Sequence, residues 1–198
     1  DGSRLIGLDD SRERLSKFHG KISDRKSDIF LRKQSLQHHP FGSSVFDLAW
    51  GIWSLHHPGN LSRILRTLYP ILKSGGTLIC ATPLHGSFSE LYRFIQEKQN
   101  PEEESFIFAA RDEFPSIAAC EKAVTESGLQ FQKATETSFS FQTELLNLKK
   151  SFLVENLYGL WAGASSTIAN VLEETVETSE QSQLEVSIHL GVFCATKP

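Results

Sequence analysis

The chain has 198 residues, enough for one domain with a sizeable core, and its 39% hydrophobic and 22% charged residues are typical of a globular protein. The net charge of -4 offers no basic footprint for nucleic acid, and no apolar run is long enough to cross a membrane. No signal peptide is visible, and the three cysteines are scattered in mostly apolar surroundings. We therefore expect a single cytoplasmic domain with buried free thiols, without a disulfide framework.

The first elements expected along the chain are a short strand and a helix. Residues 4–8 form an apolar run typical of a strand, the acidic pair Asp9–Asp10 follows, and Ser11 can cap a helix that reaches Phe18. An acidic residue at the carboxyl end of a strand can accept hydrogen bonds from both hydroxyls of a ribose. The alternative is a solvated acid at the start of a helix, and these residues alone leave both interpretations open.

A second strand is predicted over residues 29–36, and paired histidines stand on either side of the next apolar run. The pairs are His38–His39 and His56–His57, and they invite a metal interpretation. Adjacent residues of an extended chain point to opposite sides, however, and no zinc-like spacing supports either pair. We therefore expect no metal site.

The middle of the chain predicts a strand, a helix and another strand. Residues 45–50 are rich in strand formers, residues 59–73 place apolar side chains at helical spacing, and residues 77–81 form a buried strand. Lys73 falls in the last predicted turn of the helix, which Gly75–Gly76 can end with a positive φ. Such a unit predicts parallel strands in a sheet covered on both faces, with ligands at the carboxyl ends of the strands.

The second half of the chain predicts four helices and two strands. Ser87 with Glu90 three residues later fits a capping box for a helix that reaches about Glu97. The further elements are a helix over 114–128, a strand over 129–141 that alternates phenylalanines with polar residues, a helix over 143–158, a helix beginning at Ser165–Ser166, and a closing strand over 184–195.

Several short stretches resemble a known family. These are GLDDS at 7–11, FDLAW at 46–50 with GNLS at 59–62, GSFSEL at 86–91 and LGV at 190–192. From about residue 5 to residue 195 the chain resembles the class I S-adenosylmethionine (SAM) methyltransferases, most narrowly the malonyl-acyl-carrier-protein O-methyltransferases of biotin synthesis. The resemblance implies a Rossmann-like α/β fold, with a mostly parallel sheet, an antiparallel last strand and helices on both faces. It also implies one methyltransferase domain over residues 1–198.

The resemblance implies a set of cofactor-binding residues. Asp9 falls on the acid that binds the ribose, with Asp10 as the neighbouring candidate, and His56 can line the cavity. Ser35 stands where members of the family carry an acid that binds the adenine amino group; a hydroxyl is the weaker acceptor. The other implied contacts are Leu36 against the adenine, and the backbone of Trp50, Gly51 and Ile52 around the methionine end. The residues alone leave open that Gly51 only turns the chain.

The methyl acceptor implied by the resemblance is the free carboxylate of malonyl-acyl-carrier protein. Lys149 is the nearest cation to the place where the family carries an arginine, and Leu146 occupies that place. Lys149 can pair with the acceptor's carboxylate or lie on a solvated face, and a lysine lacks the two-pronged grip of an arginine.

Two further features bear on activity. The chain contains no methionine, and no GxGxG motif precedes its first strand, where the family carries a first strand and a glycine-rich loop. We therefore expect either a fragment or a degenerate member of the family. The alternatives for function are another small-molecule carboxyl methyltransferase, such as one acting on aconitate, a quinone-pathway methyltransferase with His56 or His57 as base, and a non-catalytic binding module.

Overall fold

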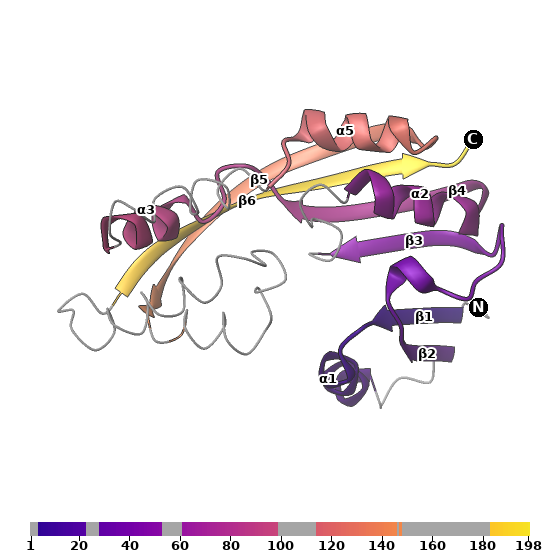
Figure 1. Ribbon diagram of the computed structural model, residues 1–198, viewed down its shortest axis with the longest axis horizontal. Helices are drawn as coiled ribbons and strands as arrows, with labels where there is room; N and C mark the ends of the chain where they lie inside the picture. Colours follow the sequence, from indigo (N-terminus) through magenta and orange to yellow (C-terminus); the bar gives the residue numbers. More distant parts are fainter. Residues whose placement is uncertain (1–3, 23–27, 53–60, 99–113, 146, 148–182) are drawn as a thin grey trace.

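The computed structural model of the protein describes residues 4–22, 28–52, 61–98, 114–145, 147 and 183–198 (Figure 1). Its elements, in chain order, are β1 (Arg4–Asp9), α1 (Arg12–Ile22), β2 (Asp28–Lys33), the 3₁₀ helix η1 (Leu36–His38), β3 (Phe46–Ile52), α2 (Leu61–Ile71), β4 (Leu72–Pro83), α3 (Ser89–Lys98), α5 (Ile117–Glu126), β5 (Gln130–Glu144) and β6 (Gln183–Thr196). Strands and helices alternate through the first half, which is the arrangement expected of an α/β protein.

The strands form two sheets. β1 pairs with β2 in a parallel two-stranded sheet, and the other four strands have the order β3-β4-β6-β5. β3 and β4 are parallel, whereas β6 runs antiparallel to both β4 and β5. The predicted α/β class and the antiparallel last strand are therefore confirmed. In Figure 1 the arrows of β1 and β3 point the same way, so their carboxyl ends lie toward the same side of the molecule.

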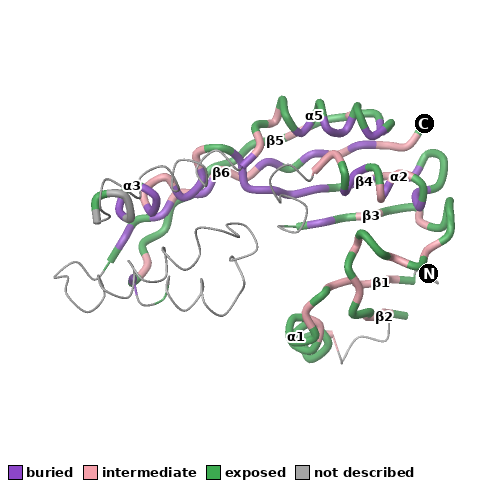
Figure 2. The backbone as a smooth tube through the Cα atoms, viewed as in Figure 1, coloured by how far each residue is buried: buried purple, intermediate pink, exposed green. Residues whose placement is uncertain are grey.

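The core lies between the four-stranded sheet and helices α2 and α5. Residues that are completely inaccessible to solvent come from both layers, among them Leu65 of α2, Leu78 of β4 and Val124 of α5. Helix α2 contributes an apolar stripe at helical spacing, consisting of Ile64, Leu65, Leu68 and Ile71. Figure 2 shows the buried residues concentrated along β4, β6 and the inner sides of these helices.

The opposite face of the same sheet carries large apolar side chains that remain accessible. They lie on one face because side chains alternate along a strand and the register pairs Trp50 with Ile79 and Ile52 with Ala81. Their exposed fractions run from 37% to 65%, for Val192, Ile79, Leu48, Trp50 and Ile52 in rising order. This face is therefore open over β3, β4 and the adjoining part of β6 within the described residues, whereas Val186 and Ile188, farther along β6 on the same face, are buried.

The boundary between α2 and β4 differs from the prediction. The helix was expected to reach Lys73, but it ends at Ile71, one residue after Pro70, and Leu72 already pairs with Phe46 of β3. Lys73 lies in β4, where its ammonium group is 2.8 Å from the carboxylate of Asp47. The positive φ expected near Gly75–Gly76 is present, at 77° on Gly75, but it serves an irregularity of the strand.

The capping box predicted for α3 is wrong. The hydroxyl of Ser87 donates to the carbonyl of His189 and accepts from its N–H, both at 3.0 Å, so it bonds to β6 and not to the helix. Glu90 accepts hydrogen bonds from the N–H and the hydroxyl of Ser187, at 3.0 and 2.6 Å. These side chains fix α3 to the edge of β6 in place of a neighbouring strand.

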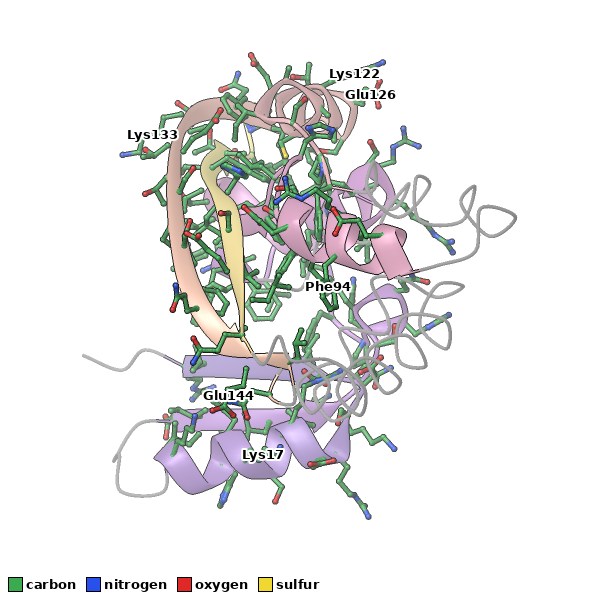
Figure 3. The ribbon with its side chains drawn as sticks, turned by 90° about the vertical axis from the view of Figure 1, so that its left-hand side faces the viewer. Lys17, Phe94, Lys122, Glu126, Lys133 and Glu144 are labelled. Carbon is green, nitrogen blue, oxygen red and sulfur yellow. The ribbon has the colours of Figure 1, made fainter. Side chains whose placement is uncertain are left out.

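β5 and β6 form a long antiparallel ribbon that extends beyond the end of β4. A register shift between Phe131 and Lys133 turns Phe131 toward the core, while Phe139 and Phe141 fall on the opposite face. Figure 3 shows the length of this ribbon, with Lys133 near one end of β5 and Glu144 at the other. Because β5 runs to Glu144, the helix predicted from residue 143 does not begin there; most of that helix and the one predicted at Ser165–Ser166 lie outside the described residues.

The first predicted helix and its cap are confirmed. The N–H of Arg14 donates to the hydroxyl of Ser11 at 3.3 Å, and the helix continues past Phe18 to Ile22. β2 is shorter than predicted, ending at Lys33, and Ser35 caps the short helix η1.

Candidate cofactor-binding site

Asp9 stands at the carboxyl end of β1, the position at which open α/β sheets bind ligands. The N–H of Gln34 donates to the carbonyl of Asp9 at 2.9 Å, which ties the chain that follows β2 to the end of β1. The side chain of Asp9 is 29% exposed and that of Asp10 is 73% exposed. Both acids are therefore accessible from the side of the sheet where a ligand would lie.

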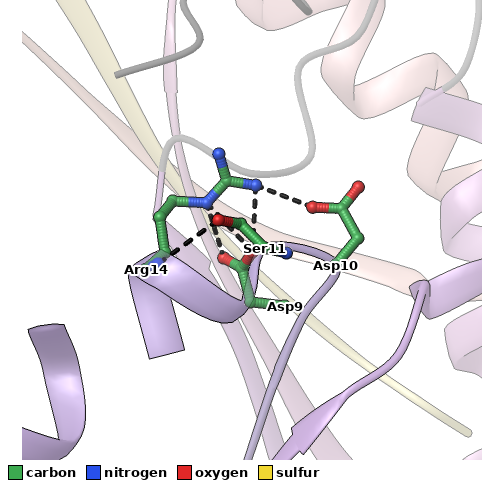
Figure 4. Close-up of polar contacts among 4 residues, drawn as sticks. All are labelled: Asp9, Asp10, Ser11 and Arg14. Carbon is green, nitrogen blue, oxygen red and sulfur yellow. Dashed lines mark hydrogen bonds and ion pairs between the residues drawn. The ribbon is translucent and has the colours of Figure 1, made fainter. Parts of the chain in front are cut away.

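The carboxylate of Asp9 is already engaged within its own segment (Figure 4). Its Oδ1 accepts from the N–H of Ser11 at 2.7 Å and from Nε of Arg14 at 2.9 Å, and its Oδ2 accepts from the same Nε at 3.0 Å. The guanidinium of Arg14 also donates to Oδ1 of Asp10 at 2.7 Å. Arg14, in the first turn of α1, therefore contacts the carboxylates of both acids.

The electrostatics of the cluster keep Asp9 ionised. Burial raises the pKa of the Asp9 carboxyl, but the hydrogen bonds from Arg14 and Ser11 outweigh it, so the pKa lies below its ordinary value. The same hydrogen bond raises the pKa of Arg14. Two carboxylates around one guanidinium leave a net negative charge at the end of β1.

The fit of a ribose to this cluster depends on how many lone-pair positions of the Asp9 carboxylate are free. A carboxylate offers about four lone-pair positions, and a ribose diol uses one on each oxygen. Oδ1 of Asp9 is filled by Ser11 and Arg14, and Oδ2 retains one position beside Arg14. Asp9 can accept one hydroxyl as it stands, and a second one only if Arg14 withdraws.

The residues predicted to contact adenine lie next to this cluster along the chain. Ser35 is exposed, and its hydroxyl accepts from the N–H of Gln37 at 3.3 Å. The amide nitrogen of Gln34 donates to the carbonyl of His38 at 2.6 Å. Leu36 packs against the core cluster beside α2, so part of its side chain is committed to the core.

The carboxyl end of β3 supplies the other predicted contacts. Gly51 is buried and pairs with Cys80 of β4, whereas Trp50 and Ile52 are 51% and 65% exposed on the opposite face of the strand. Gly51 therefore lies within β3 next to the core, one residue before the strand ends at Ile52. His56, His57 and Lys149 lie outside the described residues.

Two arrangements were missed by the sequence reasoning. Arg14 lies four residues after Asp10, the helical spacing that brings an arginine over an acid, so a signal existed in the sequence. The second arrangement had none, because it depends on how β5 pairs with β6: the hydroxyl of Ser138 lies 2.7 Å from Nδ1 of His189. His189 precedes Leu190, which pairs with Pro83 at the end of β4, and its ring lies against Gly86.

The cysteines have no role at this site. Cys80 and Cys120 are buried free thiols, as predicted, and Cys194 is partly exposed. Burial raises the pKa of Cys80 to about 12 and that of Cys120 to about 11. Among the described residues, no group of three histidine, cysteine or acidic side chains is placed to hold a metal ion.

No helix within the described part of the chain has the length and apolar character needed to traverse a membrane.

Comparison with known proteins gives the site a context. Residues 1–80 match the sequence profile of a methyltransferase domain family. No curated protein sequence matches the chain. Among solved structures, the chain is similar to the [4+2]-cyclase SpnF, with a TM-score of 0.60 and 12% identity over 98% of this chain and 67% of that one. It is also similar to the YcgJ protein of Bacillus subtilis, with a TM-score of 0.57 and 12% identity over 98% of this chain and 82% of that one.

A third similar structure is the geranyl diphosphate C-methyltransferase of Streptomyces coelicolor A3(2), solved with S-adenosyl-L-homocysteine. Its TM-score is 0.55 at 14% identity, over 100% of this chain and 63% of that one. Identities this low establish the fold alone, which is the Rossmann-like fold of class I methyltransferases. The sequence match to a methyltransferase domain family covers residues 1–80, and the similarity of fold extends over the whole chain.

Proposed function

We propose that the protein transfers the methyl group of SAM to a carboxylate oxygen of a small carboxylic acid, with malonyl-acyl-carrier protein of biotin synthesis as the first candidate acceptor. The observation that carries the transferase part is Asp9, an ionised acid at the carboxyl end of a parallel strand in this fold. The proposal includes a cytoplasmic location and an acyl-carrier protein as partner.

The acceptor part rests on the short agreements with the malonyl-carrier enzymes. When bound, SAM supplies an electrophilic methyl group on a sulfonium. A carboxylate acceptor is already ionised at neutral pH, so the protein needs no general base and contributes alignment and the exclusion of water. Ser35 and Gln34 would accept from the adenine amino group, and the backbone at Gly51 would approach the methionine end.

Binding of SAM to the native protein, measured by isothermal titration calorimetry, tests the transferase part. Asp9→Asn removes a charged acceptor, and we expect it to lower the affinity about ten- to a hundredfold. Asp28→Asn is the matched control, because Asp28 is an exposed acid at the start of β2 and away from the carboxyl end; it should leave affinity unchanged. Equal effects of the two substitutions would contradict the assignment of Asp9.

Methyl transfer, followed by mass spectrometry, tests the acceptor. The protein is incubated with SAM and either malonyl-acyl-carrier protein or a panel of free acids that includes aconitate. The proposal expects a methyl ester on the carrier-bound malonyl group and little product from the free acids. If only a free acid gives a methylated product, the acceptor is that small carboxylic acid and not the carrier-linked malonyl group.

A second candidate function is methylation of a hydroxyl on an aromatic small molecule, as in quinone pathways. The Ser138–His189 pair favours it, because a hydroxyl acceptor must lose a proton and an oriented imidazole can take it. His189→Gln should then lower turnover about a hundredfold or more while SAM affinity stays unchanged. His19→Gln is the control, since His19 lies on the exposed surface of α1. If His189→Gln leaves turnover unchanged, the hydroxyl acceptor is contradicted and a carboxylate acceptor is favoured.

A non-catalytic binding module is the remaining alternative. The occupation of Asp9 by Arg14 and of Ser35 by Gln37 favours it, because the side chains predicted to bind the ribose and the adenine amino group already have partners within the chain. Absence of SAM binding in the calorimetric experiment would support this alternative over the enzyme.

A further inference from the structure

We propose that Arg14 is a gate that competes with the ligand at the nucleoside site: it occupies Asp9 in the free protein and withdraws onto Asp10 when a nucleoside with two free ribose hydroxyls binds. This inference rests on the proposed function only in taking Asp9 as the ribose acceptor. It adds a residue that competes with the ligand, and it specifies a nucleoside with an intact diol as the ligand class.

The competition follows from the hydrogen bonds around Asp9. Nε of Arg14 lies 2.9 Å from Oδ1 and 3.0 Å from Oδ2, so a single N–H spans both carboxylate oxygens. The N–H of Ser11 takes a further position on Oδ1 at 2.7 Å. A ribose diol approaches a carboxylate through both oxygens, the two that Arg14 spans. The arginine and the diol cannot both be fully bonded to Asp9.

Asp10 gives the displaced arginine a second partner. Its Oδ1 already accepts from the terminal guanidinium nitrogen of Arg14 at 2.7 Å, at the helical spacing of four residues. The side chain of Arg14 is 43% exposed and that of Asp10 is 73% exposed, so a shift of the guanidinium toward Asp10 requires no repacking of the core. The arginine therefore changes partners without becoming an unpaired charge.

Arg14 also bears on selectivity between nucleosides. A nucleoside lacking one or both hydroxyls cannot replace the two bonds that Arg14 makes to Asp9, so it gains little from this site. A complete diol offers two donors in exchange for those of the arginine. Arg14 therefore lowers the affinity of a nucleoside whose hydroxyls must displace it from Asp9, and it leaves the affinity of a nucleoside without ribose hydroxyls unchanged.

The test measures binding of adenosine and of 2′,3′-dideoxyadenosine to the native protein by titration calorimetry, so it needs no turnover. Arg14→Met removes the competitor, and we expect adenosine to bind about two- to fivefold more tightly, the size expected from releasing a largely exposed ion pair. Dideoxyadenosine binding should not change. Arg12→Met removes an equal charge from the same turn of α1, and it should leave both affinities unaltered.

Asp10→Asn tests the second partner of the arginine. It should weaken adenosine binding by about a factor of two to five, because the displaced guanidinium then loses its alternative partner. Combined with Arg14→Met the effect should vanish, which a double-mutant cycle detects. Arg14→Lys is a second variant for the case in which Arg14→Met alters the fold. Its ammonium group can bond to one oxygen of Asp9 and leave the other for the ligand. The adenosine affinity of Arg14→Lys should therefore fall between those of wild type and Arg14→Met.

The outcomes separate this inference from the proposed function. Weaker adenosine binding by Arg14→Met, or an equal gain for adenosine and dideoxyadenosine, would overturn the gate while Asp9 remains the nucleoside site. Loss of SAM binding upon Asp9→Asn combined with unchanged adenosine affinity in both Arg14 variants would also overturn the gate alone. Absence of any nucleoside or SAM binding in wild type and variants would overturn the proposed function and the gate together.

Discussion

The β1–α1–β2 unit and the four-stranded sheet differ sharply in how they are packed. In α1 no residue is buried, and every position of β1 and β2 is exposed or half-buried. In the sheet, Leu65, Leu72 and Leu78 have no exposed surface at all. Figure 2 makes the contrast visible, with the N-terminal unit coloured only as intermediate or exposed.

The contrast separates what holds the molecule together from what would bind its ligand. Each fully buried leucine contributes about 1.5–3 kcal/mol to folding, and the buried core residues lie mainly on β4, β6, α2 and α5. Asp9 and Arg14 lie on the weakly packed unit, where local hydrogen bonds rather than a core set their positions. Changes at this site should therefore alter binding with little effect on stability, whereas changes in the core of the sheet should lower stability.

The largest expected effect comes from a cavity in the packed region. Leu65→Ala deletes a completely buried side chain from α2, and we expect a loss of about 2–5 kcal/mol in the free energy of unfolding. Leu15→Ala makes the same change in α1, where the side chain is half-buried, and we expect about 1 kcal/mol or less. Urea denaturation followed by circular dichroism measures both. Equal losses would show that the N-terminal unit shares the core's packing.

A smaller effect is expected from overfilling the same region. A Cβ at Gly191 would lie 2.8 Å from Cδ1 of Ile117 and from Cδ2 of Leu84, closer than side chains pack. Gly191→Ala should therefore cost about 1–3 kcal/mol. At Gly20, on α1, a Cβ would meet nothing within 4 Å, and Gly20→Ala should be neutral or stabilise by up to about 1 kcal/mol. Thermal unfolding of the two variants compares the regions; destabilisation by Gly20→Ala would contradict the contrast.

Local patterns allowed much of this fold to be predicted from the sequence. Strand β3, helix α2 and strand β6 follow apolar periodicities, and Ser11 caps α1 as its residue type favours. The boundary at Ile71 was misplaced because pairing of Leu72 with β3 ends the helix before the glycines do. The role of Ser87 was misassigned because a serine satisfies a strand edge as well as a helix end, and only tertiary contact decides between them.

The candidate site was predicted less completely than the fold. Asp9 could be predicted as a site residue because its place at the end of a strand is a local feature. The contact of Arg14 could also have been predicted, because Arg14 is four residues after Asp10. The Ser138–His189 pair could not be found, because their separation along the chain is bridged only by the register of β5 on β6. The proposed roles of His56 and Lys149 stay predictions, since both lie outside the described residues.

The least disruptive prediction uses the thiols to compare the two faces of the four-stranded sheet. Burial raises the pKa of Cys80 to about 12 from its ordinary 9.0, and the neighbouring Cys120 adds to the shift. Folding therefore favours the neutral thiol: the resulting stability is complete below pH 9.0 and is lost as the pH rises through the folded-state pKa of about 12. At pH 8 we expect a thiol reagent to label the partly exposed Cys194, and Cys80 and Cys120 at least about a hundredfold more slowly, because they react only after the core opens. Mass spectrometry of the labelled chain measures the rates, and labelling of all three at one rate would mean that the core on the helix face of the sheet is open as well.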